Sequence, residues 1–143
     1  MNLSISESTD VNSLNQSVQP NRFHGLKILV VDDEADSLDI LTLVLQSEGA
    51  EVISVESAPA ALDIFTQTTC DLIISDIGMP HIDGYTLIEE IRKLPQGENL
   101  PAIAVTAYVG DMEMQQSLAA GFPKHINKPI DISELIATIT KLL

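Results

Sequence analysis

The fold is decided by residues 26–38, which read LKILVVDDEADSL. Within residues 27–31, Lys27 is followed by the apolar, largely β-branched run ILVV, which is typical of a strand covered on both faces of a sheet. Asp32 and Asp33 follow this run directly, and a helical spacing of apolar residues starts at residue 34. We therefore expect a buried strand that carries two carboxylates at its carboxyl end and then leads into a helix.

The same alternation continues to the end of the chain. Apolar runs predict further strands at residues 51–55, 71–75, 101–106 and 125–127. Apolar spacing and capping residues predict helices at residues 34–48, 57–67, 84–94, 111–120 and from 131 onward. Five strands that alternate with five helices imply right-handed crossovers and a parallel sheet. Helices on both faces make this sheet a doubly wound one.

Polar side chains gather at one predicted edge of this sheet. Asp76 ends an apolar run in DLIISDIGMPHIDGY (residues 71–85), and Lys128 follows the last short strand in INKPI (residues 126–130). A single Asp after a strand could be only a helix cap, whereas a set of polar groups favours a ligand site, which doubly wound folds place beyond the carboxyl ends of their strands. The members of this set are Asp32, Asp33, Asp76, Thr106 and Lys128.

The chemistry of this set points to a metal ion and a phosphoryl group. Two carboxylates about 4 Å apart repel by roughly 4 kcal/mol at an effective dielectric constant of about 20, so three of them raise a pKa or attract a cation. Oxygen ligands in a small acidic pocket favour Mg²⁺, with Mn²⁺ as a substitute. Once the charge is offset, one carboxylate can attack phosphorus. Lys128 could then pair with a phosphoryl oxygen, and Thr106 could donate a hydrogen bond to another.

The composition limits the possible functions. The 143-residue chain carries a net charge of −14, which argues against direct binding to nucleic acid. No apolar run approaches the ~20 residues that a bilayer requires, so we expect no membrane contact. Cys70 is the single cysteine, and a reducing cytoplasm is the expected compartment. Residues 1–24 are polar and lack periodicity, which predicts a flexible tail before a domain at residues 25–143.

The motifs VVDDE, SDIGMPHIDGY, AVTAY and NKPI together resemble the receiver domain of two-component response regulators, over residues 26–143. The resemblance implies a flavodoxin-like α/β fold with strand order 2-1-3-4-5, and a signalling switch rather than an enzyme. It implies that Asp76 accepts a phosphoryl group from a sensor histidine kinase or a histidine phosphotransfer protein, with Thr106 as the switch hydroxyl and Lys128 as the phosphate-pairing cation. The implied Mg²⁺ ligands are Asp32, Asp33, Asp76 and the backbone carbonyl of Gly78.

The resemblance also implies roles for residues beside the site. Ala107 matches the small neighbour of the switch hydroxyl, and the Lys128–Pro129 peptide bond is expected to be cis. His125 stands where the family has a rotating Tyr or Phe, and an imidazole adds pH sensitivity to such a switch. Tyr108 is bulky beside the site, so the rate of phosphate loss does not transfer from other members of the family.

Because the chain ends after the last predicted helix, we expect a free-standing receiver, with a receiver cut from a hybrid sensor kinase as the alternative. A downstream protein target would then read the signal from a surface. The resemblance implies that this surface comprises residues 111–120, residues 124–127 and the outer side of the last helix.

Three other functions fit the sequence less well. A phosphorylation-independent, receiver-like binding module would be expected to lack one of the acids or the lysine. An aspartyl-phosphate phosphatase of the haloacid dehalogenase type needs a second acid two residues after its nucleophile, where this chain has Gly78. A flavodoxin would place the phosphate of FMN against Asp32 and Asp33, which would repel it.

Overall fold

The apolar runs form strands at the predicted places. The structure is a computed structural model that describes residues 22–107 and 110–143. Its strands are β2 (Lys27–Val31), β3 (Glu51–Val55), β4 (Leu72–Asp76), β5 (Ala102–Thr106) and β6 (Lys124–Asn127). Its helices are α2 (Ala35–Ser47), α3 (Ala58–Gln67), α4 (Gly84–Arg92), α5 (Asp111–Ala120) and α6 (Ile132–Leu142), with the short 3-10 helix η1 (Pro95–Gly97) between α4 and β5.

The five strands form one parallel sheet in the order β3-β2-β4-β5-β6, which confirms the predicted order 2-1-3-4-5. The chain passes from β2 outward to β3 and then returns to β4 on the other side of β2, so the strand order reverses beside β2. In the register of the sheet, Asp76 lies opposite Val105 and Thr106 lies opposite Asn127. The residues that follow these strands are therefore neighbours at one edge.

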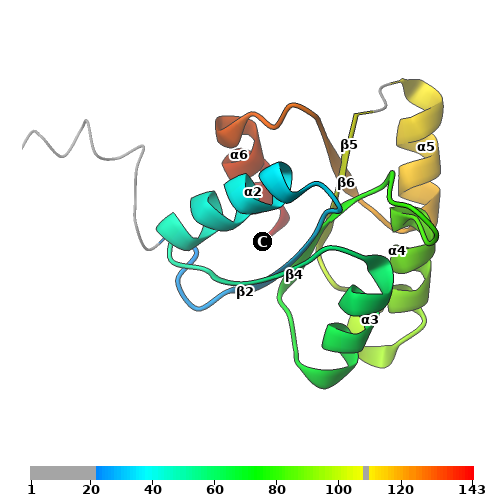
Figure 1. Ribbon diagram of the computed structural model, residues 1–143, viewed down its shortest axis with the longest axis horizontal. Helices are drawn as coiled ribbons and strands as arrows, with labels where there is room; N and C mark the ends of the chain where they lie inside the picture. Colours follow the sequence, from blue (N-terminus) through cyan, green and yellow to red (C-terminus); the bar gives the residue numbers. More distant parts are fainter. Residues whose placement is uncertain (1–21, 108–109) are drawn as a thin grey trace, which may run out of the picture.

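Helices cover both faces of the sheet, which confirms the doubly wound prediction (Figure 1). Helices α2 and α6 lie on one face, and their apolar side chains share a buried cluster with the strands. Helices α3 and α4 pack on the other face in a second cluster, and α5 lies beside α4. Because every residue of β4 and β5 is buried between these layers, polar chemistry is confined to the strand ends.

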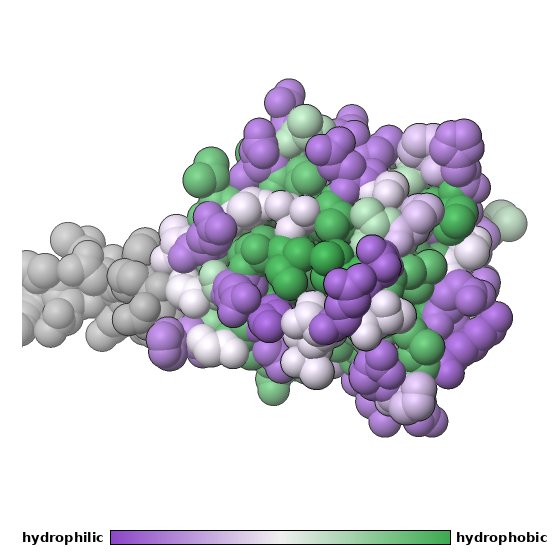
Figure 2. All heavy atoms as spheres, turned by 60° about the horizontal axis from the view of Figure 1, so that its bottom comes forward, coloured by the Kyte–Doolittle hydropathy of each residue, from purple (hydrophilic) through white to green (hydrophobic). Residues whose placement is uncertain are grey.

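On the face shown in Figure 2, hydrophilic residues surround a central group of hydrophobic ones.

Capping differs between the helices that surround the edge. Ser57, Asp83 and Asp131 each accept a hydrogen bond from the backbone N–H three residues later, at 3.2, 2.9 and 3.0 Å, and so begin α3, α4 and α6. These caps fit the helices that the sequence predicts from residue 57 and from residue 131. Helix α5 is instead preceded by Gly110, which has a φ of 139° and no side chain with which to cap the helix. The amino end of α5 is thus less firmly held than that of α4.

The carboxyl end of α4 is fixed by one guanidinium group. Arg92 donates hydrogen bonds to the carbonyl oxygens of Gly97 at 2.8 Å, Leu100 at 2.6 Å and Gly121 at 3.2 and 2.7 Å. These carbonyls belong to η1, to the segment before β5 and to the turn after α5. Helix α4 ends at Arg92 rather than at the predicted residue 94, shortly before Pro95 opens η1.

The folded part of the chain begins earlier than the sequence indicated. Phe23, which the prediction assigned to the flexible tail, is only 3% exposed and packs in the cluster beneath α2 and α6. Its N–H donates to the carbonyl of Glu48 at 2.7 Å, and Arg22 lies 3.6 Å from the Glu48 carboxylate. An isolated apolar residue in a polar stretch has no periodicity that would reveal its burial. The rest of the predicted tail, residues 1–21, and Tyr108 lie outside the described residues.

Candidate functional site

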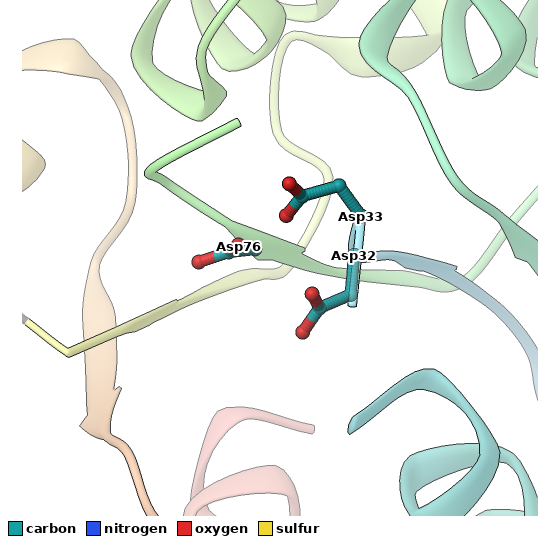
Figure 3. Close-up of side chains that lie close together, drawn as sticks. All are labelled: Asp32, Asp33 and Asp76. Atoms are coloured by element: carbon teal, nitrogen blue, oxygen red, sulfur yellow. The ribbon is translucent and has the colours of Figure 1, made fainter. Parts of the chain in front are cut away.

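Three carboxylates meet beyond the ends of β2 and β4 (Figure 3). Asp32 and Asp33 extend from β2 and Asp76 ends β4, and one oxygen of each lies within 4.8 Å of the others. Asp32 and Asp76 are buried, whereas Asp33 is exposed. The backbone fixes Asp32, because its N–H continues the β2–β3 ladder to the carbonyl of Val55 at 3.2 Å. The predicted acidic cluster is therefore present.

Lys128 brings the positive charge to this cluster. Its backbone N–H donates to the carbonyl of Thr106 at 2.8 Å, and the Lys128–Pro129 peptide bond is cis, as expected. Its ammonium nitrogen lies 3.1 Å from Asp32 Oδ2, 3.5 Å from Asp76 Oδ2 and 2.6 Å from Glu34 Oε1. The single ammonium group of Lys128 therefore lies close to three carboxylates.

The charges at the site perturb one another. Burial, followed by the charge of Asp32, raises the pKa of Asp76 to about 6, and Lys128 opposes this shift. Partial burial alone would lower the pKa of Lys128, but hydrogen bonds to Glu34 and Asp32 and the charge of Asp76 raise it overall. The hydrogen bond from Lys128 lowers the pKa of Glu34. At neutral pH the site holds several carboxylates and one ammonium group.

The carboxylates open into a pocket of ≈220 Å³. The residues that line it are Asp33, Glu34, Asp76, Gly78, Ala107 and Lys128. Because Gly78 and Ala107 have small side chains or none, there is room above the Asp76 carboxylate for a group of several atoms. Thr106, at the end of β5, is 2% exposed and lies directly before Ala107.

The donor set fits a hard divalent cation. Three carboxylate oxygens are close enough to share one ion. The buried Oδ2 of Asp32 accepts no hydrogen bond within the described part of the chain, although the Lys128 ammonium is 3.1 Å away. An unsatisfied buried carboxylate oxygen, together with the raised pKa of Asp76, means that Lys128 alone does not compensate the negative charge. Oxygen-only donors of this kind suit Mg²⁺.

Gly84 sets the distance between α4 and the site. Its N–H donates to the carbonyl of Ile77 at 2.9 Å, and a Cβ at this position would collide with the backbone carbonyl oxygen of Asp76. A residue with a side chain would therefore push α4 away from the end of β4. The first turn of α4 consequently packs directly against the end of β4 that carries Asp76.

Sequence reasoning found most of these residues and missed one. It placed Glu34 only at the start of a helix, whereas the structure places its carboxylate closest to the Lys128 ammonium. The available signal was a third consecutive acid in VVDDE. His125 does not lie in the pocket. It is half-buried in β6, its Nε2 lies 3.1 Å from Asn127 Oδ1, and it lines a separate groove between α5 and β6.

The match to known families agrees with this geometry. The profile of the response regulator receiver domain matches residues 28–140. The chain belongs to this family. Receiver domains are typically signalling modules rather than enzymes. Within the described residues of this receiver domain, no helix combines the length and apolar character needed to cross a membrane.

Relatives of this receiver domain occur both as short chains and within much longer sensor proteins. An uncharacterized 14.6 kDa protein of Leptolyngbya boryana is 43% identical over 80% of the chain and 87% of its own length. The sensor protein GacS of Pseudomonas syringae pv. syringae is 33% identical over 80% of the chain, which spans only 13% of GacS.

Solved receiver structures share the fold. The chemotaxis response regulator CheY4 of Vibrio cholerae superimposes with a TM-score of 0.79 at 27% identity, over 82% of this chain and 98% of CheY4. The receiver domain of a signal transduction histidine kinase from Syntrophus aciditrophicus superimposes with a TM-score of 0.76 at 29% identity, over 83% of this chain and 90% of that one.

Proposed function

We propose that this receiver domain is a phosphoacceptor switch, and that Asp76 takes a phosphoryl group from a phosphohistidine of a sensor histidine kinase or a histidine phosphotransfer protein. The observation that carries the proposal is the position of Asp76, at the base of an acidic pocket with the ammonium of Lys128 3.5 Å from its carboxylate. Membership of the receiver family supports the choice of phosphodonor.

In the proposed transfer, one bond to phosphorus forms and one breaks. An oxygen of the Asp76 carboxylate forms a bond to phosphorus, and the phosphorus–nitrogen bond of the phosphohistidine breaks. The electron pair of that bond stays on the imidazole nitrogen, which takes up a proton. Mg²⁺, held by Asp32, Asp33, Asp76 and the carbonyl of Gly78, would supply positive charge to the carboxylates and to the phosphoryl oxygens.

The remaining residues of the pocket act on the product. Lys128 pairs with one phosphoryl oxygen as a point charge. The hydroxyl of Thr106 donates a hydrogen bond to another, and Ala107 leaves the space that the phosphoryl group needs. In this proposal, movements of Thr106 and Lys128 transmit the effect of phosphorylation to β5 and β6. The two residues are linked, since the backbone N–H of Lys128 donates a hydrogen bond to the carbonyl of Thr106.

The output would leave through a protein surface made of α5, β6 and the outer side of α6. This face contains a groove of ≈400 Å³ between α5 and β6, and His125 is one of the residues that line it. The net charge of −14 favours a protein target over nucleic acid. The relatives include a short chain and a sensor histidine kinase, which is compatible with a free-standing receiver and with one that belongs to a hybrid kinase.

The test is phosphorylation by a small donor. We expect the protein incubated with Mg²⁺ and acetyl phosphate to gain one phosphoryl group by mass spectrometry, and hydroxylamine to remove it as it removes acyl phosphates. Asp76→Asn should abolish the gain. Asp39→Asn, which removes the same charge from the exposed side of α2, should retain it.

Two outcomes would contradict the proposal. The first is a label that persists in Asp76→Asn or forms without a divalent metal, which would place the acceptor elsewhere. The second is the absence of any label in the parent protein with acetyl phosphate and with several phosphorylated kinases, which would favour a phosphorylation-independent binding module.

A further inference from the structure

The shortest contact of the Lys128 ammonium is to a carboxylate outside the buried acidic cluster. Glu34 Oε1 lies 2.6 Å away, compared with 3.1 Å for Asp32 Oδ2 and 3.5 Å for Asp76 Oδ2. The Glu34 side chain is 63% exposed, whereas those of Asp32 and Asp76 are 1% and 7% exposed. The cation of the site is therefore held most closely by its most solvated partner.

Glu34 is placed there by the backbone of the acidic motif. Its N–H donates to Asp32 Oδ1 at 2.9 Å, which fixes the turn between β2 and α2. Its side chain lines the same pocket as Asp76 and Lys128. The hydroxyl of Ser37, one turn along, lies 3.5 Å from Glu34 Oε1. The carboxylate of Glu34 thus stands at the mouth of the pocket that a phosphoryl group would enter.

Before Lys128 can pair with an incoming phosphoryl oxygen, it must break its contact with one of its present carboxylate partners. An ammonium group has three N–H donors, and three carboxylates already lie within 3.5 Å of its nitrogen. Loss of the ion pair would leave Asp32 or Asp76 charged and buried, which is costly. The exposed Glu34 carboxylate can exchange Lys128 for water at little cost.

We infer that Glu34 is a positioning residue that competes with the phosphoryl group for Lys128 and so sets the donor concentration at which the domain becomes phosphorylated. This inference rests on the proposed phosphoacceptor function and deepens it. In the unphosphorylated protein the Glu34 carboxylate occupies Lys128. During transfer to Asp76, Lys128 leaves Glu34 and pairs with a phosphoryl oxygen, and the bonds made and broken at phosphorus are those described above.

The kinetic test uses acetyl phosphate over a range of concentrations at saturating Mg²⁺. We expect Glu34→Gln to lower the half-saturating concentration by about two- to fivefold, the range that an exposed ion pair supports, with little change in the maximal rate. Glu56→Gln is the matched control, since it removes the same charge from the residue after β3, at the same edge of the sheet. It should change the half-saturating concentration less than Glu34→Gln does.

A double-mutant comparison tests whether Glu34 acts through Lys128. In a Lys128→Met background, the extra effect of Glu34→Gln over Glu56→Gln should disappear. A second measurement does not depend on the rate of phosphorylation. In NMR spectra of lysine-labelled, unphosphorylated protein, Glu34→Gln should shift the Lys128 side-chain resonances, and Glu56→Gln should leave them in place.

The two failures are distinguishable. A parent protein without label would refute the phosphoacceptor function itself. A parent that is labelled normally, while Glu34→Gln matches Glu56→Gln or requires more donor than the parent, would refute only the competition. Unchanged Lys128 resonances in Glu34→Gln would refute it as well.

Discussion

At Asp76, burial and the charge of Asp32 raise the pKa of a carboxyl group to about 6. The unfolded chain has an Asp pKa of about 3.9, so the folded protein binds this proton more tightly. The contribution of Asp76 to stability is therefore complete at low pH and is lost as the pH rises from about 4 through about 6. At neutral pH the metal-free site is a source of instability that the fold tolerates.

This linkage predicts the effect of neutralising the residue. Without metal at about pH 7.5, Asp76→Asn should raise the free energy of unfolding by about 2 kcal/mol, because it removes a buried like charge. The difference should vanish below about pH 4, where Asp76 is protonated in both states. Urea unfolding of parent, Asp76→Asn and Asp39→Asn across this pH range tests it. A variant that is less stable than the parent at pH 7.5 would contradict this account of the charge.

Asp33 allows the metal to be tested separately from the acceptor. Mg²⁺ should raise the melting temperature of the parent, since a ligand at ten times its Kd stabilises by about 1.4 kcal/mol. Asp33→Asn should lose most of this response and should be more stable than the parent without metal. Because Asp33 is exposed, the metal-free gain should be smaller than for Asp76→Asn. A full Mg²⁺ response in Asp33→Asn would place the ion elsewhere.

At the scale of helices and strands, the sequence predicted the type and order of the five strands and five α-helices but not the short 3-10 helix η1. Apolar runs and helical spacing are local signals that burial on both faces of the sheet reinforces. It could not predict contacts made by single side chains over long distances. Arg92 holds carbonyls from three segments, Phe23 fills a site beneath two helices, and Glu34 reaches Lys128 across 94 positions of sequence. The acidic site could be predicted, because its residues follow strand ends that are recognisable in the sequence. The contacts of Arg92, Phe23 and Glu34 could not, because they depend on how distant segments pack in the folded protein.

The contacts of Arg92 predict a strong effect for one exchange. Arg92→Ala would leave the carbonyls of Gly97, Leu100 and Gly121 without their donor, so the free energy of unfolding should fall by about 2–4 kcal/mol. Lys93→Ala is the neighbouring control. It removes an exposed ion pair to Glu90 and should change stability little. Equal effects of the two variants in chemical denaturation would show that the bonds of Arg92 contribute little.

At the scale of the whole molecule, the boundary of the domain can be measured. Deletion of residues 1–21 should leave the melting transition and phosphorylation intact. Phe23→Ala should lower the free energy of unfolding by about 3 kcal/mol, since this buried ring packs under α2 and α6. If the deletion abolished cooperative melting, or if Phe23→Ala were neutral, the folded domain would have a different boundary.

The coupling between the site and the distant face is a second prediction at this scale. Phosphorylation of Asp76 should change hydrogen exchange in α5, β6 and α6 more than in α2, because Thr106 and Lys128 link the pocket to β5 and β6. Thr106→Ala should still accept the phosphoryl group but reduce the distant change. Equal changes in the parent and Thr106→Ala would exclude this route.

The close contact of Gly84 with the carbonyl of Asp76 makes the pocket mechanically asymmetric. On that side, the capped first turn of α4 is stiff, because no space remains for it to approach β4. The start of α5 is held differently, because Gly110 provides no side chain to cap the helix and Gly110 and Asp111 are both exposed. We therefore expect a structural change that starts at Asp76 to move the start of α5 more than the start of α4.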